Sequence, residues 1–389
     1  MHTPNKAPQE AYRGFEQGPI RPPSEANSLL IRVTRNCPWN RCAFCPVYKG
    51  SRFSIRPTAH VIQDIDAVWQ HIEALQQKTT GTGGLSRYEL RQTLQGAGQQ
   101  DLLAFNAALN WYTTGMHSIF LQDANSLIVK PSELIAILGH LQRRFGEVAR
   151  ITSYARSHTV ARIKTADLET MRAQGLNRIH IGLESGSDQV LKRVRKGVTQ
   201  ATQIKAGLKV VQAGMQLSEY VMPGLGGRDL SRTHALETAK ALNQINPHFI
   251  RLRTLALPNS IPLFDEWQAG RFDKCSDVEM AQEILLFLEN LNGITSVVKS
   301  DHILNLFQEV EGTLPQDKDR MTGILKEFLG LAPDEQCLYQ VGRRLGVFTR
   351  LSDMQNTHRR QKTEQVCREL GVTPDNVDQI IDELMKRFI

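Results

Sequence analysis

Three cysteines crowd into a short stretch near the N-terminus and carry the clearest chemistry in the sequence. Cys37, Cys42 and Cys45 are spaced C-x4-C-x2-C within residues 36–46, which we call the Cys loop. Three thiolates on one loop can hold three irons of a cubane cluster, whereas iron–sulfur clusters normally take four cysteines. One iron would then stay open to a substrate or cofactor. The spacing therefore predicts a [4Fe-4S] cluster with an open iron.

A zinc site is the alternative interpretation of the same cysteines. A structural zinc ion takes four ligands, usually as two pairs, and no second C-x2-C or H-x3-H pair follows nearby. The nearest downstream histidine is His60, at an expected helix start. The chain has 47 basic and 40 acidic residues, and this excess leaves nucleic acid open as a partner. A zinc-binding, nucleic-acid-binding protein is therefore the second hypothesis.

The elements around the Cys loop alternate between strand-like and helix-like patterns. The six predicted strands are Leu29–Thr34, Ser118–Gln122, Ala149–Tyr154, Asn177–Gly182, Leu217–Met222 and Phe249–Leu255. The helices predicted between them are Val61–Leu75, Asp101–Trp111, Pro131–Phe145, Thr165–Gln174, Asp188–Arg195, Thr199–Ala213 and Ser231–Asn243. Such alternation predicts an α/β fold with a parallel sheet. Without a dinucleotide fingerprint, a partial (β/α)6 barrel is favoured, with its chemistry at the carboxyl ends of the strands.

The chain divides into three expected parts. Residues 1–27 are polar and Pro-rich and are predicted to form a flexible N-terminal arm, followed by the barrel over 28–265. Within the barrel, Thr79–Gly98 is rich in Gly, Gln and Thr and is expected to be a surface excursion. Residues 266–389 are predicted to form a helical C-terminal domain, with helices at Val278–Leu291, Asp301–Val310, Asp319–Leu329 and Val377–Phe388.

Polar side chains follow the later strands and supply further site candidates. Asp123 and Asn125 follow the second strand, Arg156 follows the third, and Glu184 stands in Gly-Leu-Glu-Ser-Gly after the fourth. Lys196 comes shortly afterwards, within Arg-Lys-Gly-Val-Thr. All of these candidates except Glu184 have a plain structural alternative: an Asx turn for Asp123 and Asn125, a solvated surface arginine for Arg156, and a favourable helix-end charge for Lys196.

The Cys loop, the barrel and the Gly-x-Glu-Ser-Gly motif together resemble the radical S-adenosylmethionine (SAM) superfamily, over about Leu29 to Leu263. The fourth-strand motif is similar to that of the methylthiotransferase and oxygen-independent coproporphyrinogen oxidase groups. The usual loop in the superfamily is C-x3-C-x2-C with an aromatic residue before the last cysteine. Phe44 matches that aromatic residue, while the first gap is one residue longer here. The resemblance implies that Phe44 packs beside the adenine of SAM.

The same resemblance implies roles for the other candidates. Glu184 would bind the ribose hydroxyls of SAM, Lys196 and Arg156 its carboxylate, and Asp123 or Asn125 its amino group. The implied activity is reductive cleavage of SAM at the cluster to a 5′-deoxyadenosyl radical, which acts on a substrate that the sequence does not identify. A small-molecule substrate and an electron donor such as flavodoxin or ferredoxin are the implied partners.

The remaining features bear on location and on the C-terminal domain. The sequence has no apolar run of transmembrane length and no apolar segment typical of a secretory signal, so we expect a cytoplasmic protein without membrane contact. Three scattered cysteines, at 275, 337 and 367, form no disulfide framework. Asp301, His302 and Asn305 lie in the predicted helix Asp301–Val310. His302 and Asn305 are expected to close over the barrel and to touch substrate.

Overall fold

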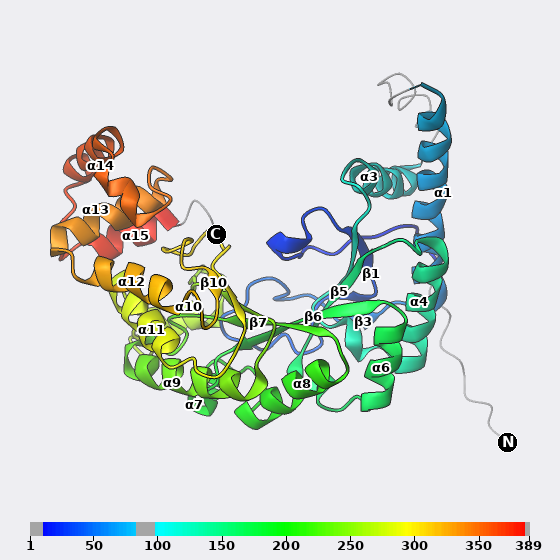
Figure 1. Ribbon diagram of the computed structural model, residues 1–389, viewed down its shortest axis with the longest axis horizontal. Coiled ribbons are helices and arrows are strands. Elements are labelled where there is room, and N and C mark those ends of the chain that lie inside the picture. Colours follow the sequence, from blue (N-terminus) through cyan, green and yellow to red (C-terminus); the bar gives the residue numbers. More distant parts are fainter. Residues whose placement is uncertain (1–10, 83–97, 386–389) are drawn as a thin grey trace.

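An open sheet of eight strands forms the centre of the computed structural model, which describes residues 11–82 and 98–385. The strands run in the order β1-β4-β5-β6-β7-β8-β9-β10, all parallel except the last (Figure 1). Their bounds are β1 Leu29–Arg32, β4 Ser118–Gln122, β5 Arg150–Ala155, β6 Leu176–Glu184, β7 Gln216–Val221, β8 Phe249–Leu252, β9 Val297–Lys299 and β10 Gly312–Thr313. The predicted α/β fold and its six parallel strands are confirmed.

Helices cover the outer face of the sheet because that face is apolar. Most side chains on this face, such as those of Ile119, Ile181 and Ile250, are fully buried in the main hydrophobic core beneath the helices. Figure 1 shows these helices along the outside of the sheet. Their bounds are α1 Thr58–Thr82, α3 Gln99–Thr113, α4 Pro131–Arg144, α5 Ser157–Val160, α6 Thr165–Ala173, α7 Asp188–Arg193, α8 Gln200–Gln212, α9 Gly227–Ile245 and α11 Asp277–Glu289. The short helix α10 Pro262–Gln268 lies instead against the Cys loop, where the amide of Leu263 donates to the carbonyl of Ala43 at 3.0 Å.

The inner face of the sheet carries aromatic and polar side chains instead. Phe120, Tyr154, His180 and Tyr220 come from four adjacent strands and pack ring against ring, with centroid separations of 5.1–6.5 Å. Phe120 and His180 are fully buried. These rings close the interior of the barrel, so open space for a ligand lies at the carboxyl ends of the strands, which we call the barrel mouth.

The sheet extends beyond the six strands expected from the sequence. β9 pairs in parallel with β8, and β10 pairs with β9 in the antiparallel sense. Both fall in the region predicted to be a helical domain. They span only three and two residues, which is too short for alternation to reveal a strand.

The predicted helix Asp301–Val310 is wrong, because these residues form turns in the structure. The helices found farther along are α12 Lys318–Leu329, α13 Pro333–Arg344, α14 Thr357–Leu370 and α15 Val377–Met385, grouped at one side of the molecule (Figure 1). Of the predicted excursion at Thr79–Gly98, residues 83–97 lie outside the described residues, and Thr79 to Thr82 continue α1. Among the described residues, no helix combines the length and the apolar character needed to cross a membrane.

The described part of the predicted N-terminal arm, residues 11–27, packs against the barrel. Glu16 forms ion pairs with Arg35 and Arg56, at 2.7 and 2.6 Å. The backbone of Gly18 exchanges hydrogen bonds with the side-chain amide of Gln122 at the end of β4. The sequence pattern did not reveal this packing because the contacts join residues about 20 to 100 positions apart.

Candidate functional site

The Cys loop begins at the end of β1 and is bracketed by a two-stranded ribbon, β2 Thr34–Arg35 with β3 Ser54–Ile55. All three of its thiols are free and partly exposed. The backbone amide of Asn40 donates to the Sγ atom of Cys37 at 3.4 Å. The Nζ atom of Lys49 donates to the carbonyls of Asn40 and Cys42, at 3.2 and 2.9 Å. The thiols therefore project from a loop whose backbone is already fixed.

The Cys loop docks on the segment that follows β6. The amide of Ala43 donates to the carbonyl of Val194 at 2.9 Å, and the indole nitrogen of Trp39 donates to the carbonyl of Arg195 at 2.8 Å. Gly197 permits this approach: it has a φ of +73°, and a Cβ atom there would lie 2.3 Å from the Trp39 ring. A larger residue at position 197 would push the two segments apart.

Glu184 and Lys196 form an ion pair beside the Cys loop, with Nζ and Oε1 2.9 Å apart. A register shift between β6 and β7 falls at Glu184, whose φ is +62°. Such a shift re-aims a side chain, here toward the mouth. Gly182 leaves room for the pair, because a Cβ atom there would lie 2.2 Å from the carboxylate. Lys196 also lies over the ring of Phe44, 5.6 Å from its centroid.

Arg156 completes the cluster of cations near the thiols. Its guanidinium donates to the carbonyl of Lys196 at 2.7 Å and stacks over Trp39, 5.0 Å from the ring centroid. Burial lowers the pKa of Arg156, and the thiols of Cys42 and Cys37 oppose that change. The ends of β1, β5 and β6 therefore bring three thiols, two cations and one carboxylate together.

The electrostatics of the thiols fit a metal-bound state. Burial raises the pKa of Cys42 and of Cys45, while Lys196 lowers both and Arg156 also lowers that of Cys42. A bound cluster needs thiolates, so its binding releases protons, and the adjacent cations favour the charged form. In the described residues, no three His, Cys, Asp or Glu side chains are placed to hold a single metal ion. Three thiolates on one loop have the chemistry that would hold three irons of a cubane cluster.

Asp123 bonds three groups of the chain itself. One carboxylate oxygen accepts from the guanidinium of Arg32 at 2.8 Å and from the backbone amide of Asn36 at 3.1 Å. The other accepts a short hydrogen bond from the hydroxyl of Tyr48. Asp123 thus ties β4 to both ends of the Cys loop. This positioning role was missed from the sequence, and a contact of Asp123 with the SAM amino group stays a prediction.

Asn125 fixes the start of the segment that carries Arg156. Its amide oxygen accepts from the backbone of Arg156 at 3.0 Å, and its nitrogen donates to Thr159 at 2.9 Å. Asn125 is fully buried. Its fixed contacts therefore position Arg156, and direct binding of SAM by Asn125 also stays a prediction.

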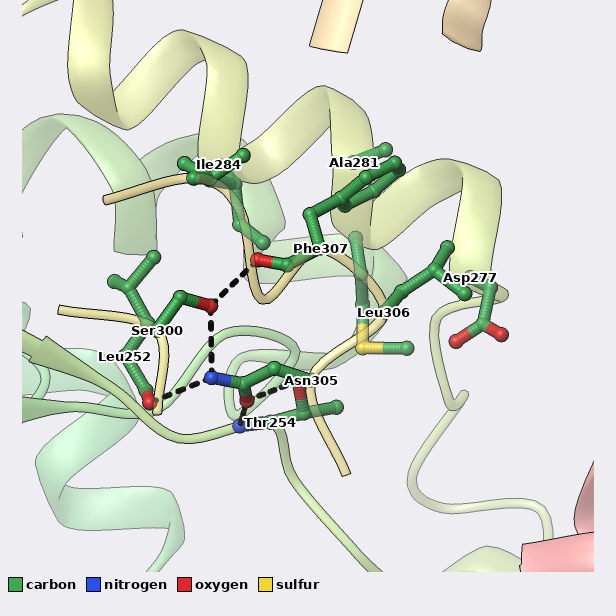
Figure 2. A pocket seen from close by; sticks show the side chains of 11 residues that line it. Leu252, Thr254, Asp277, Ala281, Ile284, Ser300, Asn305, Leu306 and Phe307 are labelled. Carbon is green, nitrogen blue, oxygen red and sulfur yellow. Dashed lines mark hydrogen bonds between the residues drawn. The ribbon is translucent and has the colours of Figure 1, made fainter. Parts of the chain in front are cut away.

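The residues predicted to close over the barrel lie beyond the carboxyl ends of β8 and β9. We call this region, made of residues 252–254 and 300–307, the β8–β9 edge. Asn305 is buried, donates to the carbonyl of Leu252 at 2.9 Å and accepts from the amide of Thr254 at 2.9 Å (Figure 2). Ser300 donates to the carbonyl of Phe307 at 2.7 Å, in the same small pocket. These bonds fasten the turn at 300–307 to the end of β8. Asn305 therefore has a structural role here, separate from the thiols.

Asp301 and His302 lie nearer to the inside of the barrel. Asp301 forms a 2.5 Å ion pair with Arg251 of β8. Burial lowers the pKa of His302 to about 4, and the nearby guanidinium of Arg253 acts in the same direction. The imidazole is therefore neutral near pH 7. Arg253 was not among the site residues predicted from the sequence, although it lies near the end of the predicted strand Phe249–Leu255.

Comparisons with known proteins give similarity only at the level of solved structures: no family model and no curated protein matches the chain. One similar structure is the coproporphyrinogen III oxidase HemN of Escherichia coli, with a TM-score of 0.44 and 15% identity over 68% of this chain and 52% of that chain. Another is the methyltransferase TsrM of Kitasatospora setae, at 0.42 and 13% over 66% and 43%. Both are described as radical SAM enzymes.

A third similar structure is the archaeal Elp3 of Methanocaldococcus infernus, with a TM-score of 0.40 and 15% identity over 51% of this chain and 53% of that chain. The chain thus spans about half the length of the Elp3 and HemN chains and less than half of TsrM.

Proposed function

We propose that this chain is a cytoplasmic radical SAM enzyme acting on a small-molecule substrate. The observation that supports it most is the meeting of three free thiols with Arg156, Glu184 and Lys196 at one edge of a parallel sheet. When bound, a [4Fe-4S] cluster supplies an open iron for SAM and the electron that cleaves it to methionine and a 5′-deoxyadenosyl radical.

The side chains around the thiols have the chemistry to orient SAM. The guanidinium of Arg156 and the ammonium of Lys196 suit its carboxylate, and the carboxylate of Glu184 suits the ribose hydroxyls. Burial alone would lower the pKa of Lys196, but the Glu184 carboxylate keeps it above its usual range, so Lys196 stays cationic. The Phe44 ring, beside that cation, offers a face for the adenine.

Two further parts of the proposal concern the cell. The six cysteines are all free, which suits a reducing compartment such as the cytoplasm. An electron donor such as flavodoxin or ferredoxin is needed, because the chemistry consumes an electron that the chain does not itself supply. The partly exposed Cys loop gives such a donor a short path to the cluster.

The direct test is anaerobic reconstitution with iron and sulfide, followed by incubation with SAM and dithionite and measurement of 5′-deoxyadenosine. We expect product from the wild-type protein and none from the Cys37→Ala, Cys42→Ala and Cys45→Ala variants. Cys367→Ala is the matched control, since Cys367 lies on α14, and this variant should retain both iron and product. Full cleavage by Cys42→Ala, or zinc that survives reconstitution at full stoichiometry, would contradict the proposal.

A further inference from the structure

Arg253 is an unpaired cation at the barrel mouth. Its backbone amide donates to the carbonyl of Val221, so residue 253 continues the pairing of β8 with β7. Alternation along β8 puts its side chain on the same inner face as that of Arg251. The Arg253 side chain is exposed and forms no hydrogen bond or ion pair with any residue in the described ranges.

The carboxylate of Asp301, which like Arg253 acts on His302, is already paired with another cation. Asp301 pairs with Arg251 at 2.5 Å, and Arg251 also donates to the hydroxyl of Ser218 at 3.2 Å. Asp301 therefore neutralises Arg251, and the positive charge of Arg253 is left for something outside the chain. An unpaired guanidinium at the end of an inner strand is a recognition group for carboxylate or phosphate, because its planar fork matches both.

One buried hydroxyl near this cation lacks a well-formed hydrogen bond within the described residues. The hydroxyl of Tyr220 is buried, with 8% of the residue exposed; its neighbour is the hydroxyl of Tyr154, but the two do not meet in good hydrogen-bond geometry, and no other described residue is its partner. Buried polar atoms are nearly always paired, so such a hydroxyl indicates a missing partner. Tyr154 and His302 also lie within electrostatic range of Arg253, and His302 contributes a neutral ring.

The same groups adjoin the proposed SAM site. Tyr154 lies on β5 two residues before Arg156, which stands next to the thiols. Tyr154 is also within electrostatic range of Tyr48, whose hydroxyl bonds Asp123 at the base of the Cys loop. A molecule held by Arg253 and Tyr220 would therefore lie beside the proposed SAM site.

We infer that Arg253, with the Tyr220 hydroxyl, binds the anionic oxygen group of the substrate, a carboxylate or a phosphate, so that the enzyme acts on an anionic small molecule. This inference rests on the proposed function for its chemistry. The binding itself does not require the cluster, because none of these side chains is part of the Cys loop. The anion site and the proposed radical SAM activity can therefore be tested and rejected independently.

The test titrates the reconstituted full-length protein with succinate, inorganic phosphate and uncharged succinamide, and follows the melting temperature. A ligand that binds only the folded state raises that temperature with concentration. We expect stabilisation by succinate or phosphate and none by succinamide, which also tells a carboxylate site from a phosphate site. The apparent affinity should fall by about tenfold or more in Arg253→Gln, since that factor corresponds to one lost charge-assisted contact.

Matched variants keep the result interpretable. Arg368→Gln removes an exposed arginine on α14 and should bind the anion like the wild type. Arg253→Lys should bind with intermediate affinity because it keeps the charge but loses the fork, and Tyr220→Phe should bind more weakly than the wild type. The titration is repeated with saturating SAM, which should leave anion binding in place.

Several outcomes would overturn the inference. They are no stabilisation by either anion, equal stabilisation in Arg253→Gln, and loss of anion binding when SAM is present, which would assign Arg253 to the SAM site. Formation of 5′-deoxyadenosine by the wild-type protein, measured without added anion, reports on the proposed function alone. A protein that cleaves SAM but binds neither anion would therefore leave the proposed function standing and reject the anion site.

Discussion

Two regions of the mouth use polar side chains in opposite ways. On the side of the Cys loop, three thiols and Arg156 lie close together, and Arg156 has no carboxylate partner among the described residues. At the β8–β9 edge, Asn305 has both ends of its amide bonded within the chain. Polar groups that are left without partners indicate a place for a ligand, whereas fully bonded ones hold elements together. Substitutions beside the Cys loop should therefore weaken SAM binding or cleavage, whereas substitutions at the β8–β9 edge should lower the free energy of unfolding.

The largest expected effect on stability lies with the helices that pack beside the β8–β9 edge. Arg344 of α13 donates to both oxygens of Asp277 at 2.8 and 2.9 Å and to the carbonyl of Leu304, and the side chains of the pair are only 4% and 3% exposed. Arg344→Met leaves the buried carboxylate of Asp277 without its partner, so we expect a loss of about 3–5 kcal/mol in the free energy of unfolding. Urea unfolding measures it, with Arg368→Met as the exposed control; equal losses would refute the assignment.

The next effect separates the two regions directly. Asn305→Ala leaves the amide of Thr254 and the carbonyl of Leu252 without their partner, which should cost about 2–3 kcal/mol of stability. Formation of 5′-deoxyadenosine per folded molecule should stay at the wild-type level. A stable Asn305→Ala protein that has lost SAM cleavage would instead favour the sequence-based expectation that Asn305 acts in the site.

The opposite pattern is expected for Arg156. Its charge is partly buried without a carboxylate partner, so Arg156→Gln should change the free energy of unfolding by less than about 1 kcal/mol. The affinity for SAM should fall by about tenfold, because one charge-assisted hydrogen bond is lost. Equilibrium binding of labelled SAM to the reconstituted protein measures this. Unchanged affinity for SAM together with marked destabilisation would instead show that Arg156, like Asn305, stabilises the fold.

The smallest effect concerns pH. The pKa of His302 is about 4 in the folded chain, below the value of about 6.5 in an unfolded one. Between those pH values the unfolded chain binds more protons, so the stability of the wild-type protein should decrease as pH falls through this window. His302→Asn should show a shallower decrease, measured by urea unfolding from pH 7 to pH 4.5. Identical pH profiles would show that His302 is not buried as the structure has it.

The sequence predicts the Cys-loop region better than the β8–β9 edge, and the reason is physical. The Cys loop and Glu184 lie at the carboxyl ends of strands. Because these ends meet at the barrel mouth in any parallel sheet of this kind, the sequence alone brings the two together. At the other edge, apolar residues such as Ile303, Leu306 and Phe307 follow a helical spacing but lie in turns. The bonds of Asn305 and Ser300 replace helical hydrogen bonds there, and such tertiary bonds are invisible to periodicity.

Other details of the site depended on contacts between distant segments. Asp123 was considered as a SAM ligand or an Asx turn, yet its partners Arg32 and Tyr48 come from about 75 to 90 residues away in the chain. α14 escaped prediction because it has few apolar residues and only Thr363 is buried along it. The residue types in a loop thus indicate its chemistry, whereas the hydrogen-bond partners of those residues can be identified only from the fold.

The central claim is that the three thiols leave one iron open for SAM beside Arg156 and Lys196. Electron–nuclear double resonance on the reduced, reconstituted protein tests it most directly, using SAM labelled with ¹⁵N in the amino group and ¹⁷O in the carboxylate. We expect hyperfine coupling of both labels to the cluster. A reconstituted cluster that shows no coupling to either label, or zinc in place of iron at the three cysteines, would contradict the account.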